Sequence, residues 1–259
     1  RTVNTGEYRF AVGSAGSTTL VFQTVLLPLL FAGETSEIKL EGGTHNGFSP
    51  SYDFIEMCFL PAIARMGYRV DVELDRYGFY PAGGGAWKVR IHPMKGVAKL
   101  DLTERGAVVR QLAVAISSQI PEHITQRELA LVQKKCLWTG DQLQQRFVDS
   151  VGPGNMVSLR IESEHVTEVV EVVGQKQLSA ERVAGSAIKA IKTYLESGVP
   201  VGEHLADQLL LPMVLAKGGK FRTLSPSQHL LTNIEVIKQL MDVDVRVKQE
   251  SEYVWQISV

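Results

Sequence analysis

The stretch KFRTLSPSQHLLTNI, residues 220–234, decides the fold because its centre repeats an earlier part of the chain. The tripeptide Ser-Pro-Ser occurs at residues 225–227 and also at residues 49–51. Each copy follows an apolar segment containing Leu-Pro and a short basic and apolar strand, and each precedes apolar residues at helical spacing. This self-similarity predicts two copies of one supersecondary unit.

Each copy predicts the element order α-β-α-β-β. The helices after the tripeptide run into alternating strands at residues 69–74 and 243–247, followed by final strands at 86–91 and 253–259. The first unit also has an opening strand at residues 8–12, which makes it β-α-β-α-β-β. The glycine and serine residues after that strand predict a helix start that is either an ordinary N-cap or a phosphate-binding turn, and the residues favour neither.

A different pattern lies between the two copies. Strands are predicted at residues 108–116, 157–161 and 167–173, and helices at 122–138 and 180–195. We therefore expect an α/β (α+β) fold of repeated β-α-β-α-β-β units with an inserted small α/β domain. Its expected divisions are a repeat of the main domain at 1–101, the inserted domain at 102–197 and a second repeat at 198–259.

The composition of the 259 residues is that of a globular protein, with 44% hydrophobic and 21% charged residues. The net charge of −1 means that any nucleic-acid contact must come from a local basic patch. The longest apolar run, residues 20–32, is too short to span a bilayer, and the polar residues 1–7 do not form a signal peptide. We expect no membrane association and a cytoplasmic location. Cys58 and Cys136 lack CxxC spacing and are expected to be buried thiols.

Three features could carry chemistry. His229 starts a helix two residues after Ser227, although the residues alone favour an ordinary surface histidine. The segment at 202–208, GEHLADQ, places carboxylates around a helix start, as a cap, as a ligand for metal or ribose, or as a solvated first turn. The glycine-rich stretch at 78–85 favours a wide hairpin slightly over a close approach to a ligand.

Five stretches of this sequence resemble the bacterial RNA 3′-terminal phosphate cyclase family. They are YRFAVGSAGSTTLVFQ (8–23), RYGFYPAGGG (76–85), GPGNMVS (152–158), VGEHLADQLLLP (201–212) and HLLTNI (229–234). The resemblance implies ATP-dependent conversion of RNA 3′-phosphate ends to 2′,3′-cyclic phosphates, with a divalent metal such as Mg²⁺ or Mn²⁺. The nucleophile of the family falls on His229, which would carry AMP covalently.

The resemblance also implies an ATP site. Its positions here are Gln23, His204, Leu205, Ala206, Asp207 and Gln208, together with Pro50 and Phe54, which match the wall near the adenine. Position 204 is a tyrosine in well-known bacterial members, and an imidazole can also stack on adenine. Family members open with a further repeat before the segment that begins at Arg1, bearing a glycine-rich, glutamate-containing motif and several arginines. The resemblance therefore implies a fragment of a longer protein, or a site completed in another way.

Two other function classes stay open. A non-catalytic RNA-processing relative would lack the nucleophile, so His229 argues against it, whereas the missing opening repeat partly favours it. An enolpyruvyl transferase-like enzyme of the same repeat fold would need arginine and lysine clusters near the repeat loops. The sequence shows no such clusters in order.

Overall fold

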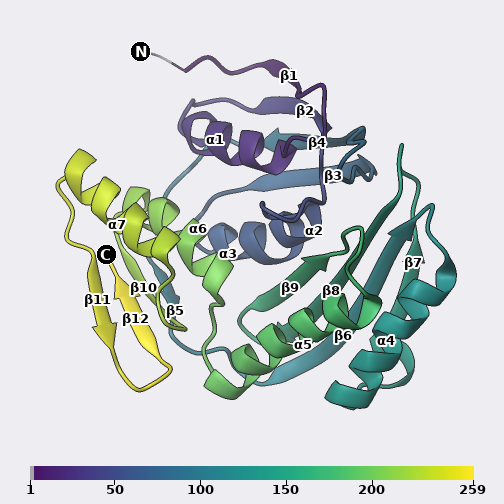
Figure 1. The fold of residues 1–259 in the computed structure, drawn as a ribbon. Coiled ribbons are helices and arrows are strands. Elements are labelled where there is room, and N and C mark those ends of the chain that lie inside the picture. Colours follow the sequence, from purple (N-terminus) through teal and green to yellow (C-terminus); the bar gives the residue numbers. More distant parts are fainter. Residues whose placement is uncertain (1–2) are drawn as a thin grey trace.

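The computed structural model describes residues 3–259. Arg1 and Thr2, which belong to the polar segment 1–7, lie outside the described residues. The described strands form three four-stranded sheets. Two of these sheets enclose a layer of helices, and the third lies to one side with its own pair of helices (Figure 1). The arrangement is the mixed α/β fold that the sequence predicts.

The first sheet has the strand order β1-β2-β4-β3. β1 runs parallel to β2, whereas the pairs β2–β4 and β4–β3 are antiparallel. The elements of this unit are β1 (Glu7–Ala11), α1 (Thr18–Leu30), β2 (Ser36–Gly42), α2 (Tyr52–Phe54), the π-helical stretch η1 (Ile55–Phe59), α3 (Leu60–Ala64), β3 (Val70–Arg76) and β4 (Gly85–Ile91). The helix that follows Ser51 is interrupted by η1, which ends two residues before Pro61.

The second sheet repeats this topology, with the order β5-β10-β12-β11. β5 runs parallel to β10, and the pairs β10–β12 and β12–β11 are antiparallel. The elements are β5 (Leu100–Leu102), α6 (Glu203–Leu215), β10 (Gly219–Thr223), α7 (Gln228–Leu240), β11 (Arg246–Gln249) and β12 (Trp255–Ser258). The second unit therefore also has an opening strand, β5, and the boundary predicted after residue 101 falls within it.

The repeated tripeptide has the same structural role in both units. Ser51 is the N-cap of α2, and its Oγ accepts a hydrogen bond from the Phe54 amide at 2.9 Å. Ser227 is the N-cap of α7, and its Oγ accepts from the Leu230 amide at 3.1 Å. The last serine of each Ser-Pro-Ser thus fixes where a helix begins.

The third sheet lies between β5 and α6 in the sequence, and we call residues 103–201 the inserted region. Its strand order is β7-β6-β8-β9, with α4 and α5 packed together against it (Figure 1). The elements are β6 (Val108–Ser118), α4 (Glu122–Cys136), the 3₁₀ turn η2 (Gly140–Gln142), β7 (Leu143–Phe147), β8 (Gly154–Ser163), β9 (Thr167–Val173) and α5 (Ala180–Ser197). β7 was not predicted, because this edge strand, LQQRF, lacks an apolar alternation.

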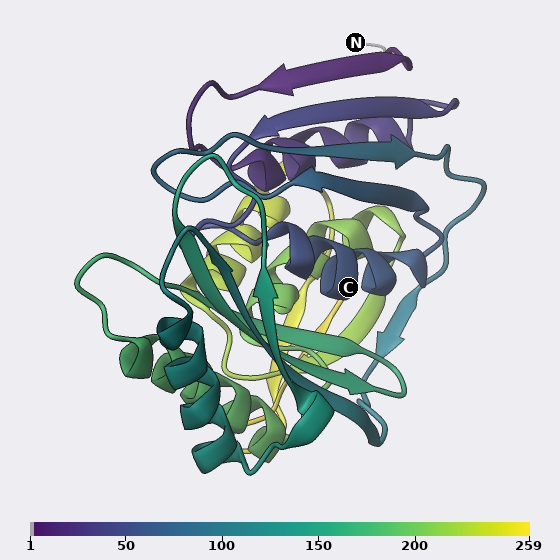
Figure 2. The same cartoon turned by 90° about the vertical axis from the view of Figure 1, so that its right-hand side faces the viewer.

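One hydrophobic core joins the two repeat sheets and their helices. Trp87 of the first sheet and Phe221 of the second belong to it, and so does Val169 of β9. The inserted region therefore packs directly against the main body. Figure 2 shows its β7–β8 loop reaching toward the β3–β4 loop, where Tyr77 bridges to Ser150.

Two composition-based expectations can be compared with the structure. Cys58 is buried and Cys136 is half-buried, and both are free thiols. Within residues 3–259, no helix has the length and apolar character needed to cross a membrane.

Candidate active site

The candidate site lies where α1, α6 and α7 meet. α6 packs against α7, and the Asn233 side chain of α7 donates a hydrogen bond to Asp207 Oδ1 of α6 at 3.3 Å. His229 lies one helical turn before Asn233, so it lies on the same side of α7. The predicted nucleophile and the predicted ATP-binding helix are thus neighbours.

His229 is exposed at the start of α7 because the helix buries its other face. Leu230, Ile234 and Ile237 pack into the core at helical spacing, while Ser227 caps the first turn. The imidazole of His229 is also close enough to Asp207 to affect the pKa of its carboxyl. Burial raises the pKa of the Asp207 carboxyl, and the nearby His229 and His204 partly offset that rise.

The predicted segment from residue 204 to residue 208 divides into two faces. The side chains of Leu205 and Ala206 are fully buried in the core, so they can meet a ligand only through their backbone. His204 is exposed, and Asp207 and Gln208 are half-buried. The side chains of these three residues form the accessible face of α6.

A second wall of the site comes from α1. Gln23 Nε2 donates a hydrogen bond to Gln208 Oε1 at 2.5 Å, across 185 residues of sequence. Thr19, one turn earlier on α1, donates from Oγ1 to the carbonyl oxygen of Pro50 at 2.6 Å. α1 is therefore hydrogen-bonded to Gln208 of α6 through Gln23 and to Pro50 through Thr19.

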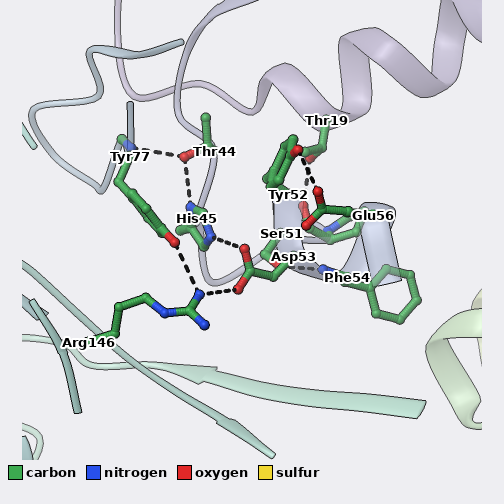
Figure 3. Close-up of polar contacts among 12 residues, drawn as sticks. Thr19, Thr44, His45, Ser51, Tyr52, Asp53, Phe54, Glu56, Tyr77 and Arg146 are labelled. Carbon is green, nitrogen blue, oxygen red and sulfur yellow. Dashed lines mark hydrogen bonds and ion pairs between the residues drawn. The ribbon is translucent and has the colours of Figure 1, made fainter. Parts of the chain in front are cut away.

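Hydrogen bonds within the helix that follows Pro50 fix this segment (Figure 3). The ring of Phe54 is only 3% exposed and belongs to the core, so Pro50 is the part of the predicted adenine wall that reaches the surface. Ser51, the next residue, caps α2, and Tyr52 donates a hydrogen bond to Glu56 Oε1 at 3.0 Å. The position of the wall is thus set by the helix that follows it.

A buried ionisable pair anchors the same helix. His45 Nε2 lies 3.3 Å from Asp53 Oδ1, and Thr44 Oγ1 lies 2.8 Å from His45 Nδ1 (Figure 3). Both side chains of the pair are buried. Burial opposes ionisation of Asp53, but the contacts with His45 and the charges of Arg146 and Arg160 outweigh it, so the pKa of Asp53 lies below its ordinary value.

Arg146, on β7 of the inserted region, contacts this buried pair. Its Nη1 lies 3.6 Å from Asp53 Oδ2 and donates a hydrogen bond to the Tyr77 hydroxyl at 3.3 Å (Figure 3). The sequence did not predict this network, since no local pattern assigned a role to His45 or to Arg146. No local spacing could have found it, because the two residues are about a hundred positions apart.

Glu168 is a further residue that the sequence analysis missed. It lies on β9, and its carboxyl Oε2 accepts a hydrogen bond from the amide of Gly202, the N-cap residue of α6, at 3.1 Å. The side chain is buried, and burial raises its pKa to about 8. The inserted region therefore contacts both the wall segment, through Arg146, and the start of α6, through Glu168.

The chain matches known proteins over nearly its whole length. The family model described as RNA 3′-terminal phosphate cyclase matches residues 1–247. The RNA 3′-terminal phosphate cyclase of Ectopseudomonas mendocina is 42% identical over 255 residues, which cover 98% of this chain and 74% of that protein. The protein of the same name from Pseudomonas fluorescens is 45% identical over 253 residues, which cover 97% of this chain and 74% of that protein.

Proposed function

The chain belongs to the RNA 3′-terminal phosphate cyclase family, and we propose that it converts RNA 3′-phosphate ends to 2′,3′-cyclic phosphates with ATP, through a covalent adenylate on His229. The main structural support is that an exposed His229 lies beside Asp207 on the helix that also bears His204 and Gln208. Family membership decides against the enolpyruvyl transferase alternative.

The proposed reaction has three steps. A ring nitrogen of neutral His229 attacks the α-phosphorus of ATP, forming an N–P bond while the bond to the leaving pyrophosphate breaks. An oxygen of the RNA 3′-phosphate then attacks the same phosphorus, takes the AMP and frees the imidazole. Finally the neighbouring 2′-hydroxyl attacks the 3′-phosphorus, releasing AMP and a proton and leaving the cyclic phosphate.

The accessible face of α6 suits ATP in two ways. The exposed imidazole of His204 offers a flat surface on which adenine can stack. The first-turn amides of α6 have no acceptor within the helix, and a helix N-terminus attracts phosphate groups. Gln208, held by Gln23, supplies polar groups beside them.

A divalent metal fits this site as a partner of the triphosphate. Within residues 3–259 there is no group of three or more histidine, cysteine or acidic side chains that could hold a metal by themselves. Mg²⁺ is commonly held by one or two carboxylates together with substrate phosphates, and Asp207 offers one such carboxylate. When bound there, the metal would offset charge on the polyphosphate.

Transfer of label from α-labelled ATP tests the nucleophile. We expect an acid-labile, base-stable label on the protein in the presence of Mg²⁺ or Mn²⁺, and none on His229→Ala. His123→Ala is the matched control, because His123 is an exposed first-turn histidine of α4. Undiminished labelling of His229→Ala would overturn the assignment, and absence of label on all three proteins would favour the non-catalytic alternative.

A further inference from the structure

Glu168 and Gly202 form an unusually close contact between the inserted region and α6. Besides the hydrogen bond at 3.1 Å, a Cβ atom placed on Gly202 would lie only 2.1 Å from Glu168 Oε1. The backbone of Gly202 has a φ of −75°, which any residue can adopt. Glycine is therefore required here by the Glu168 carboxyl and not by the backbone.

This contact replaces a cap that α6 lacks. Helix starts commonly use the side chain of the N-cap residue and a glutamate or glutamine at the third helical position, which accepts from the N-cap amide. In α6 these positions hold Gly202 and Leu205, neither of which can accept through a side chain. Glu168 accepts from the Gly202 amide in their place, from a strand 34 residues earlier.

Burial favours the neutral form of the Glu168 carboxyl. The titratable groups that face it are the Cys58 thiol of η1 and the Tyr194 hydroxyl of α5. The Arg105 guanidinium lies 5.1 Å from the centre of the Tyr194 ring, but burial dominates and raises the pKa of Glu168 to about 8. A neutral carboxyl can accept from the Gly202 amide without adding negative charge at the helix end where phosphates are proposed to bind.

We propose that Glu168 is a positioning residue for ATP, which fixes the first turn of α6 from the inserted region and so sets the places of His204 and Asp207. The inference rests on the proposed function, because it concerns the same nucleotide. It gives the inserted region a direct part in the ATP site. The contact of Arg146 with Asp53, in the helix that follows Pro50, is consistent with that part.

A double-mutant cycle on Glu168 and Gly202 tests the contact. The dissociation constant for ATP with Mg²⁺ is measured by calorimetry in the absence of RNA. We expect Gly202→Ala to weaken binding at least tenfold, because the new methyl group collides with Glu168. The double variant Glu168→Ala/Gly202→Ala should bind no worse than Glu168→Ala, because the collision is gone.

The pH profile separates positioning from a purely structural role. If ionised Glu168 disfavours ATP, the dissociation constant of the wild type should rise about tenfold between pH 7 and pH 9, over and above any change in Glu168→Gln. Glu168→Gln keeps an acceptor of similar shape and should bind like the wild type at pH 7. Melting temperatures of all variants show whether a loss reflects unfolding.

The outcomes distinguish the two proposals. Wild-type protein that binds ATP, together with additive effects in the cycle or parallel pH profiles of wild type and Glu168→Gln, overturns the role of Glu168 and leaves the proposed function intact. Wild-type protein that does not bind ATP overturns the proposed function and this inference with it. Non-additive effects in the Glu168–Gly202 cycle, together with a pH dependence of ATP binding that Glu168→Gln lacks, support both the proposed function and the role of Glu168.

Discussion

Replacing Arg146 with methionine should destabilise the protein, because it leaves the buried Asp53 carboxylate without the positive charge of Arg146. Arg146 Nη1 lies 3.6 Å from Asp53 Oδ2, an oxygen with no hydrogen-bond partner in the structure. Methionine keeps much of the length of the arginine stem and removes only the guanidinium. The Asp53 carboxylate would then have His45 as its remaining close partner.

The size of the loss follows from the burial of the two partners. Removing one member of a fully buried ion pair typically costs about 3–5 kcal/mol. Here the Asp53 side chain is 3% exposed but that of Arg146 is 36% exposed, so solvent screens part of the interaction. We expect a loss of about 2 kcal/mol in unfolding free energy, which corresponds to roughly 4–8 °C in melting temperature for a chain of this size.

The measurement is chemical and thermal unfolding at pH 7. Arg127→Met is the matched control, because Arg127 pairs with Glu181 at 2.8 Å on the surface, where solvent screens the interaction and such pairs contribute little. Arg146→Met combined with Asp53→Asn should lose less than the sum of the single changes, since the buried charge is gone.

The difference between wild type and Arg146→Met should also depend on pH. The pKa of Asp53 is lowered in the folded protein, so its stabilising contribution is present above its unfolded pKa of about 4 and is lost as pH falls through the folded pKa. The stability advantage of the wild type should therefore shrink in acid. Equal melting temperatures for wild type and Arg146→Met at pH 7, or an equal loss in Arg127→Met, would refute the reasoning.

Two further predictions concern ATP. His204→Tyr should lower the KM for ATP by up to about tenfold, because the larger ring adds roughly 0.5–1.5 kcal/mol of stacking, and a tenfold rise with the fold intact would show that this position does not stack on the base. Gln23→Ala and Gln208→Ala should each raise the KM for ATP by about two- to tenfold, the worth of one neutral hydrogen bond. Because they share that bond, the double variant should be little worse than either single one, and fully additive losses would contradict the pairing.

Local patterns in the sequence were sufficient for much of the fold. The repeated Ser-Pro-Ser predicted two equivalent units, and both Ser51 and Ser227 are N-caps in the structure. The predicted strand at 167–173 and the predicted helix starts at residues 122 and 180 are confirmed. Capping and periodicity depend on residues within a few positions of each other, so a single sequence contains them.

Elements defined by distant partners could not be predicted in the same way. β5 is only three residues long, and it is a strand because it pairs with β10, more than a hundred residues later. β7 has a polar sequence and becomes a strand by pairing with β6. In both cases the backbone hydrogen bonds to a neighbour outweigh weak local preference.

The candidate site also combines features that local sequence predicts with features that depend on contacts between distant residues. The sequence by itself predicted which residues form the candidate site, and it determined the helix starts that present His204 and His229, because these depend on short stretches of chain. Only the tertiary structure decided that Gln23 meets Gln208, and that Glu168 caps α6 in place of a local side chain. Those contacts form when helices and sheets pack, and burial then sets the charge of groups such as Glu168.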